Sequence, residues 1–143
     1  PKLYGLMQEF NQVPLIESNI TRVQNAPLSL TGSGVIIAFV DTGIDWKREE
    51  FLDTAGRSRI LAIWDQTIQS GTPPEGFLYG SEYTREEINS ALSGEASIDT
   101  IDENGHGTAL AAVAAGSSID GGITFLGAAP NLLILKKIKT KGR

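Results

Sequence analysis

The sequence has 143 residues, of which 41% are hydrophobic and 20% charged, a composition typical of one globular domain with its own core. Its net charge of −5 argues against nucleic acid or an anionic membrane surface as the main partner. The absence of cysteine excludes disulfides, thiolate catalysis and thiolate metal sites, and no apolar run approaches the roughly 20 residues of a membrane span.

The first part of the sequence carries weak structural signals. We expect residues 1–30 to form an N-terminal arm with one short helix, which Pro27 prevents from continuing. No signal peptide is visible. Because the sequence starts at Pro1 and stops at Arg143, just after a basic stretch, both ends look cut, and we expect a processed product or a fragment of a longer protein.

The clearest strand signal is the run "VIIAFV", residues 35–40, which follows the turn "TGSG". The run is β-branched and aromatic and apolar on both faces, so it predicts a strand in the middle of a parallel sheet, covered by helices above and below. Asp41 follows it directly. Functional groups of open α/β sheets gather at the carboxyl ends of strands, which makes Asp41 a candidate for chemistry.

Residues 57–103 form the least regular part of the sequence. The stretch "RILAIW", residues 59–64, predicts a second strand. Thr84 and Glu87 form a capping box at the start of a short helix that Gly94 ends. The acidic stretch "DTIDENG", residues 99–105, is expected to be a loop.

The last part of the sequence predicts a helix and a strand. The segment "HGTALAAVAAG" predicts a helix that begins near Asn104 and ends before Gly116. Its alanines allow the backbone to approach a sheet closely. Leu132–Ile138 predicts another apolar strand. Strands that alternate with helical crossovers indicate an α/β fold with a doubly wound parallel sheet and helices on both faces.

Asp41 and His106, the only histidine, can meet at one edge of such a sheet. A carboxylate that accepts the Nδ1–H of an imidazole fixes its tautomer and leaves Nε2 free to take and return a proton. Taken singly, a strand-end aspartate is often a turn former and a lone histidine is more often structural. Two features favour function: Asp41 ends a run with no other polar residue, and small residues surround His106.

Both residues lie in segments that resemble those of a known family. "GVIIAFVDTGID" is similar to the aspartate motif of the subtilisin-like serine proteases, "NGHGTALAAVAAG" to their histidine motif, and "LGAAP" with the strand after it to their Gly-Val-Ala-Pro segment. The resemblance implies a subtilisin-like fold, with residues 31–143 as the N-terminal portion of the catalytic domain. It also implies that Asp41 is the triad aspartate and His106 the general base.

The sequence departs from the family pattern in three places. Ala109 stands where the family often has a second histidine, which carries no proton in the mechanism. The stretch between the two motifs is longer than in compact subtilisins, and we expect an insertion at about 57–100; this stretch resembles the clostridial germination proteases, which cleave the zymogen of a spore-cortex hydrolase. No Gly-Thr-Ser-Met-Ala nucleophile motif is present.

The resemblance therefore implies part of a serine endopeptidase whose serine lies beyond this chain, with no cofactor. Candidate partners are a protein or peptide substrate, a propeptide and the missing C-terminal half, and the expected location is secreted or spore-associated. A structural calcium ion would fit the family, but no loop here has the oxygen-ligand spacing that would place it.

Two alternatives remain open at this point. A subtilase-fold pseudoprotease that regulates germination without cleaving would keep the fold, although intact Asp41 and His106 argue against it. A metal-dependent hydrolase would use Asp41, Asp45 and His106 with Asp102 or Glu103, although no His-x-x-x-His pair exists.

Overall fold

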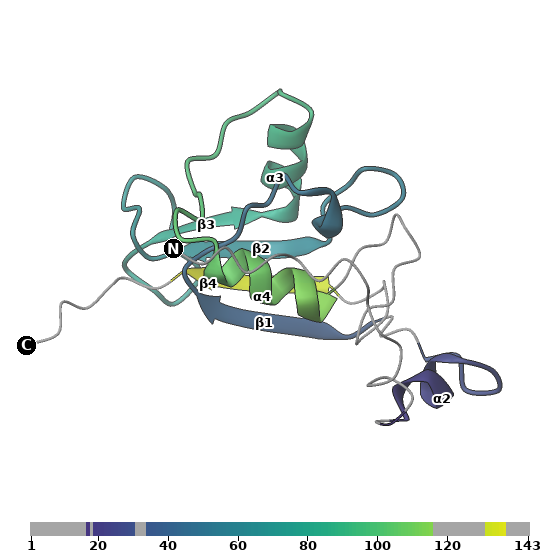
Figure 1. Cartoon of the computed structure of the whole chain (residues 1–143). Helices are drawn as coiled ribbons and strands as arrows, with labels where there is room; N and C mark the ends of the chain where they lie inside the picture. The colour runs from purple at the N-terminus through teal and green to yellow at the C-terminus, as the bar shows by residue number, and fades with distance from the viewer. Residues whose placement is uncertain (1–16, 18, 31–33, 116–130, 137–143) are drawn as a thin grey trace, which may run out of the picture.

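The computed structural model describes residues 17, 19–30, 34–115 and 131–136 (Figure 1). The helices are α2 (Ile20–Gln24), the short 3-10 helix η1 (Glu49–Phe51), α3 (Arg85–Leu92) and α4 (His106–Ala115). The strands are β1 (Ile36–Asp41), β2 (Ile60–Asp65), β3 (Ser81–Thr84) and β4 (Asn131–Lys136).

The four strands form one sheet in the order β1-β4-β2-β3. Strand β4 pairs in parallel with β1 on one side and with β2 on the other, which confirms the α/β fold. Strand β3 is antiparallel to β2, so the sheet is mixed, and the sequence did not predict this strand. An antiparallel strand at the edge of a parallel sheet is common in α/β folds.

The prediction that β1 lies in the middle of the sheet and is covered on both faces is wrong for the described residues. Strand β1 lies at one end of the described sheet, and its burial alternates along the strand. Ile37 and Phe39 pack against the core, whereas Ile36 is 59% exposed and Val40 50% exposed. An apolar run is therefore half-buried here because, among the described residues, only one face of β1 has a covering layer.

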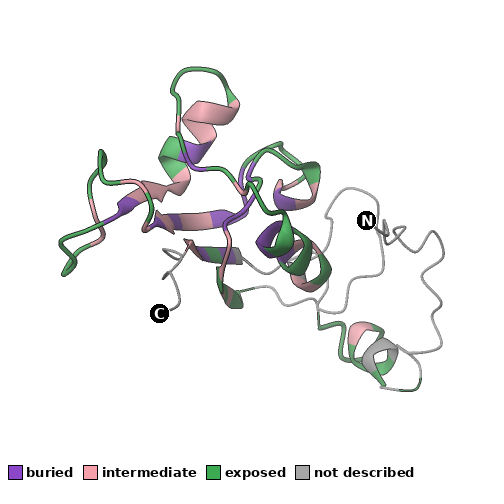
Figure 2. Ribbon diagram, turned by 60° about the vertical axis from the view of Figure 1, so that its left-hand side comes forward, coloured by how far each residue is buried: buried purple, intermediate pink, exposed green. Residues whose placement is uncertain are grey.

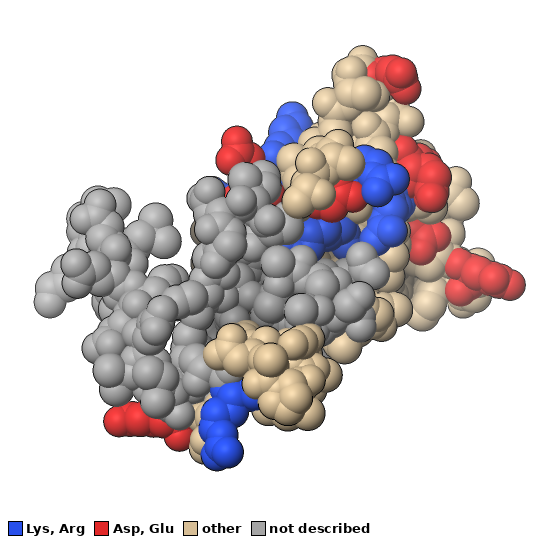
Figure 3. Space-filling view, turned by 90° about the vertical axis from the view of Figure 1, so that its right-hand side faces the viewer, with Lys and Arg blue, Asp and Glu red and all other residues tan. Residues whose placement is uncertain are grey.

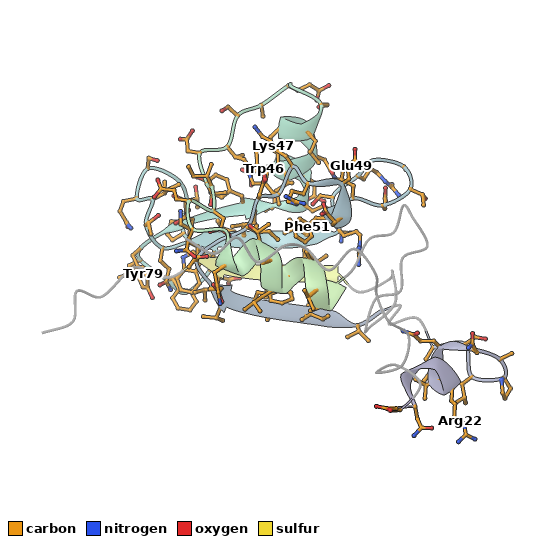
Figure 4. All side chains as sticks on the ribbon, viewed as in Figure 1. Arg22, Trp46, Lys47, Glu49, Phe51 and Tyr79 are labelled. Atoms are coloured by element: carbon orange, nitrogen blue, oxygen red, sulfur yellow. The ribbon has the colours of Figure 1, made fainter. Side chains whose placement is uncertain are left out.

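The core lies between the sheet, two helices and the loop after β1 (Figure 2). The sheet contributes Ile60 and Ile63 from β2 and Leu132 and Ile134 from β4, all buried. The other buried members are Ile88 of α3, Ala111 of α4, and Ile44, Trp46 and Phe51 from the loop and η1. Figure 4 shows Trp46 and Phe51 in this covering layer, where the Trp46 indole donates to the Thr100 carbonyl at 3.0 Å.

Three predicted helices are confirmed, and β1 and β2 each lie one residue further along the chain than the predicted strands 35–40 and 59–64. Thr84 and Glu87 form the reciprocal capping box that starts α3. Helix α4 packs on β1, and its Ala111 is completely buried. Residues 1–16, Gly116, and residues 137–138 at the end of the last predicted strand lie outside the described residues.

Residues 57–100, the expected insertion, supply β2, β3 and α3. Since β2 lies between β4 and β3, this stretch contributes a central strand and not only a surface loop. The loop after β2 is held by the Trp64 ring, whose centroid lies 4.3 Å from that of Phe77 and 5.3 Å from that of Tyr79.

Charged side chains of both signs lie side by side on the face shown in Figure 3. Among the described residues, Arg48 pairs with Glu50 at 2.6 Å and Arg57 with Asp53 at 3.1 Å, both at the surface. Within the part of the chain that the structure describes, no helix has the length and apolar character needed to cross a membrane.

Candidate active site

Asp41 and His106 meet at the edge of the sheet, although 65 positions separate them in the sequence. Asp41 is the last residue of β1 and His106 the first of α4, and α4 begins on the side of the sheet where β1 ends (Figure 1). The Asp41 Oδ1 lies 2.7 Å from the His106 Nδ1. The Thr42 N–H donates to the same oxygen at 2.7 Å.

These hydrogen bonds set the charge state of the carboxyl group. The hydrogen bond with the His106 ring, helped by the Thr42 N–H, holds the pKa of Asp41 below its ordinary value of 3.8, although partial burial acts in the opposite direction. Asp41 is therefore an ionised acceptor at neutral pH. An ionised acceptor at Nδ1 favours the tautomer in which Nδ1 carries the proton and Nε2 is a free base.

The His106 side chain is open to its surroundings. It is 61% exposed, compared with 18% for Asp41. Among the described residues, no hydrogen bond reaches its Nε2. The ring is thus held on one side by Asp41 and can meet a reacting group on the other, which is the arrangement that general base catalysis requires.

The two glycines beside His106 serve different purposes. Gly105 has φ +80°, a conformation that other residues rarely adopt, and a Cβ there would meet open space. Gly107 lies against the backbone after Asp41, because a Cβ on it would clash with the Gly43 carbonyl and lie 3.1 Å from the Asp41 Cβ. The second glycine therefore allows α4 to approach the end of β1 closely.

Three residues that the sequence analysis did not assign to the triad support the pair. Thr42 accepts a hydrogen bond from the Gly107 N–H at 3.0 Å and donates to Asp102 at 2.9 Å. Asp102 in turn accepts from the Thr108 hydroxyl at 2.6 Å. The available signal was the hydroxyl residue that closely follows each candidate, in "DTG" and in "HGT".

The residues of the metal-site alternative are not gathered into one site. The backbone N–H of Asp45 donates to the Thr108 hydroxyl at 2.9 Å. The Asp102 carboxylate accepts hydrogen bonds from the Thr42 hydroxyl and the Thr108 N–H. Across the described ranges, no group of three or more His, Cys, Asp and Glu side chains could hold a metal ion. The geometry therefore favours proton transfer by the Asp41–His106 pair.

Residues 32–141 match the model of the Subtilase family, a range that contains both Asp41 and His106. The chain belongs to the subtilase family. Its structure is similar to that of the CspB protease of Clostridium perfringens, with 32% sequence identity and a TM-score of 0.63. The match covers 82% of this chain and 23% of that protein, so the chain spans about a quarter of the length of this relative. No curated protein matches the chain.

Membership of the subtilases, together with the likeness to a clostridial protease, confirms the family resemblance seen in the sequence and the α/β fold. The family is one of serine peptidases. A nucleophilic serine in the family's motif is absent from the sequence, because the two Gly-Thr pairs are followed by Pro73 and Ala109.

Proposed function

We propose that this subtilase chain carries the aspartate and the histidine of an Asp–His–Ser triad, and that the protein containing it is a serine endopeptidase. The observation that carries the proposal is the 2.7 Å contact between Asp41 and the His106 Nδ1, with the other side of the ring exposed. The serine is proposed to come from sequence beyond these 143 residues. Below, the full-length protein means the natural protein that contains this chain.

Each group has a defined step in the proposed reaction. Asp41 keeps the proton on Nδ1, and the His106 Nε2 takes the proton of the serine hydroxyl as that oxygen attacks the peptide carbonyl. The resulting imidazolium is stabilised by Asp41 and then protonates the leaving amine. Water repeats the sequence to release the acyl group, and backbone and asparagine donors outside this chain stabilise the oxyanion.

The test uses a fluorophosphonate probe, which labels an activated serine, and hydrolysis of a protein substrate. We expect the full-length protein to be labelled and to cleave, and His106→Gln to lose both activities while remaining folded. Absence of labelling and of hydrolysis in the folded wild-type protein would overturn the proposal. That result would favour the pseudoprotease that regulates germination instead.

The narrower proposal concerns the substrate. The similarity to a clostridial protease and the resemblance of residues 57–100 to the germination proteases support a spore-cortex hydrolase zymogen as substrate. The protein would then be secreted or spore-associated, and a propeptide is a further candidate partner. We expect the full-length protein to cleave such a zymogen at one site. General proteolysis of unrelated proteins, with the zymogen left intact, would contradict this assignment without affecting the triad.

A further inference from the structure

Asp102 lies in the loop before α4 and does not touch the reacting groups, yet its carboxylate accepts five hydrogen bonds. Oδ1 accepts from the Thr42 hydroxyl at 2.9 Å, the Asn104 N–H at 3.2 Å and the Gly105 N–H at 3.0 Å. Oδ2 accepts from the Thr108 N–H at 3.0 Å and its hydroxyl at 2.6 Å. Every partner is a donor, so only an ionised carboxylate satisfies all of them.

The bond from Thr42 also sets the direction of that hydroxyl. A hydroxyl has one hydrogen to donate, and the Thr42 hydroxyl donates it in a hydrogen bond to the Asp102 Oδ1. A lone pair is left for the N–H of Gly107, which donates to it at 3.0 Å. Asp102 therefore controls the bond that joins the residue after Asp41 to the residue after His106.

The same carboxylate caps α4 at its start. The first N–H groups of a helix have no partner within the helix, and here those of Gly107 and Thr108 are satisfied by Thr42 and by Asp102. Burial alone would raise the pKa of Asp102, but the bonds from Thr108, Gly105 and Thr42 lower the pKa to about 2. The carboxylate is consequently charged over the whole neutral range.

The contacts surround both members of the proposed catalytic pair. Thr42 is bonded to Asp41 in sequence, and Gly105 and Gly107 flank His106. Asp102 holds Gly105 directly and Gly107 through Thr42, so the backbone on either side of His106 is held relative to the end of β1. The loop that carries Asp102 is itself anchored, since the Ile101 carbonyl accepts from Lys136 at 2.9 Å.

We propose that Asp102 is a positioning residue for the triad: it holds the backbone around His106 so that Nδ1 stays in contact with Asp41. The inference rests on the proposed serine peptidase function for its kinetic test. A residue that only stabilised the loop would change the amount of folded protein. A positioning residue also changes the rate and the ring tautomer of molecules that are folded.

The test compares Asp102→Asn with Asp99→Asn, the same substitution at an exposed position of the same loop. An asparagine amide has donors on one side, and in either orientation these face N–H or hydroxyl donors. We expect kcat per titrated active site of the full-length protein to fall on the order of tenfold to a hundredfold, because small displacements of catalytic groups have effects of this size. We expect KM to stay within about twofold, and Asp99→Asn to match the wild type.

A second measurement does not depend on activity. In the full-length protein with 15N-labelled histidine rings, the His106 signals are assigned by their loss in His106→Gln. The wild type should show a protonated Nδ1 and an unprotonated Nε2 in the neutral ring, whereas Asp102→Asn should show a mixture of tautomers. If the wild type hydrolyses nothing, the proposed function fails, and the ring tautomer still tests Asp102.

A pair of Thr42 variants covers the case in which Asp102→Asn does not fold. Thr42→Val removes the hydroxyl link and should reproduce the loss in kcat and the mixed tautomer, and Thr42→Ser should restore both. Where Asp102→Asn does fold, adding Thr42→Val should lower kcat by less than the product of the two single effects. Unchanged kcat per active site and an unchanged tautomer in Asp102→Asn, or in Thr42→Val, would overturn the proposal.

Discussion

Asp41 and Asp65 occupy equivalent places in the sheet and are used in opposite ways. Each ends a strand that is parallel to β4, and each pairs in register with Lys136 of β4. Asp65 is completely buried, with its carboxylate 3.1 Å from the Lys136 ammonium and 2.6 Å from the Thr100 hydroxyl. Asp41 is 18% exposed and meets the exposed ring of His106.

The difference between the two aspartates lies in their partners. Burial would raise the pKa of Asp65, but hydrogen bonds from Thr100 and Thr67 and the nearby Lys136 lower it. All of these partners are fixed, so this carboxylate holds strands and loop together. The partner of Asp41 is the imidazole of His106, whose side chain is 61% exposed. A strand-end aspartate is thus placed for proton transfer where its partner is an exposed imidazole, and it holds the fold together where its partners are buried.

Asp41→Asn should give the largest effect, and it should lower activity without changing the fold. An asparagine can donate to the His106 Nδ1 and so select the wrong tautomer, for which a loss of about 10⁴-fold in kcat is typical of serine proteases. Measurement of kcat in the full-length protein, with circular dichroism to verify the fold, tests this. Activity within about tenfold of the wild type would show that Asp41 does not orient the ring.

Asp65→Asn should have the opposite effect from Asp41→Asn and lower mainly the stability of the fold. It leaves the Lys136 ammonium, only 15% exposed, without its charged partner. Loss of one member of a buried pair typically costs about 3–5 kcal/mol. Urea unfolding of the full-length protein measures the change, with Asp99→Asn as the exposed control. A cost under about 1 kcal/mol would indicate that Lys136 reaches water when Asp65 is neutral.

The comparison also explains how much of this structure could be predicted from the sequence. Strands β1, β2 and β4 and helices α3 and α4 were expected because their signals are local: an apolar run, or a cap followed by a helical pattern. Asp41 and His106 were singled out because each lies at the end of such an element. The structure then brings the two side chains into contact.

What could not be predicted depends on residues far apart in the sequence. Thr42 and Asp102 are 60 positions apart, and Asp65 and Thr100 are 35 apart. Neither pairing leaves a periodic pattern, so "WDQT" at the end of β2 looks as suitable for chemistry as "VDTG" at the end of β1. The half-exposed state of β1 was missed for the same reason, because an apolar run does not reveal what covers each face.

Gly107→Ala tests whether the contact between Asp41 and His106 depends on the close approach of α4 to the end of β1. The added Cβ would clash with the Gly43 carbonyl, which belongs to the backbone and cannot rotate away. Overpacking of this kind typically costs about 1–3 kcal/mol, and the displaced helix should also lower kcat. Gly105→Ala provides the control, since only its positive φ opposes a side chain there, at about 1–2 kcal/mol. Equal stability and kcat in Gly107→Ala and the wild type would contradict the close contact.

A fall in pH should destabilise the fold through carboxylates whose pKa is lowered in the folded state. For Asp102 the pH range of this loss can be stated. Its folded-state pKa is about 2, below the ordinary value of 3.8, so the unfolded chain binds this proton more tightly. The resulting stabilisation is complete above about pH 4 and is lost as the pH falls through 2, and it amounts to about 2 kcal/mol. Asp102→Asn should remove this part of the acid dependence, whereas Asp99→Asn should keep it, as urea unfolding between pH 5 and pH 2 would measure. The same acid dependence in both variants would mean that the bonds to Asp102 do not stabilise its charged form. In that case neutral hydrogen bonds would hold the start of α4. Asp65, and not Asp102, would then be the structural carboxylate with which Asp41 is compared.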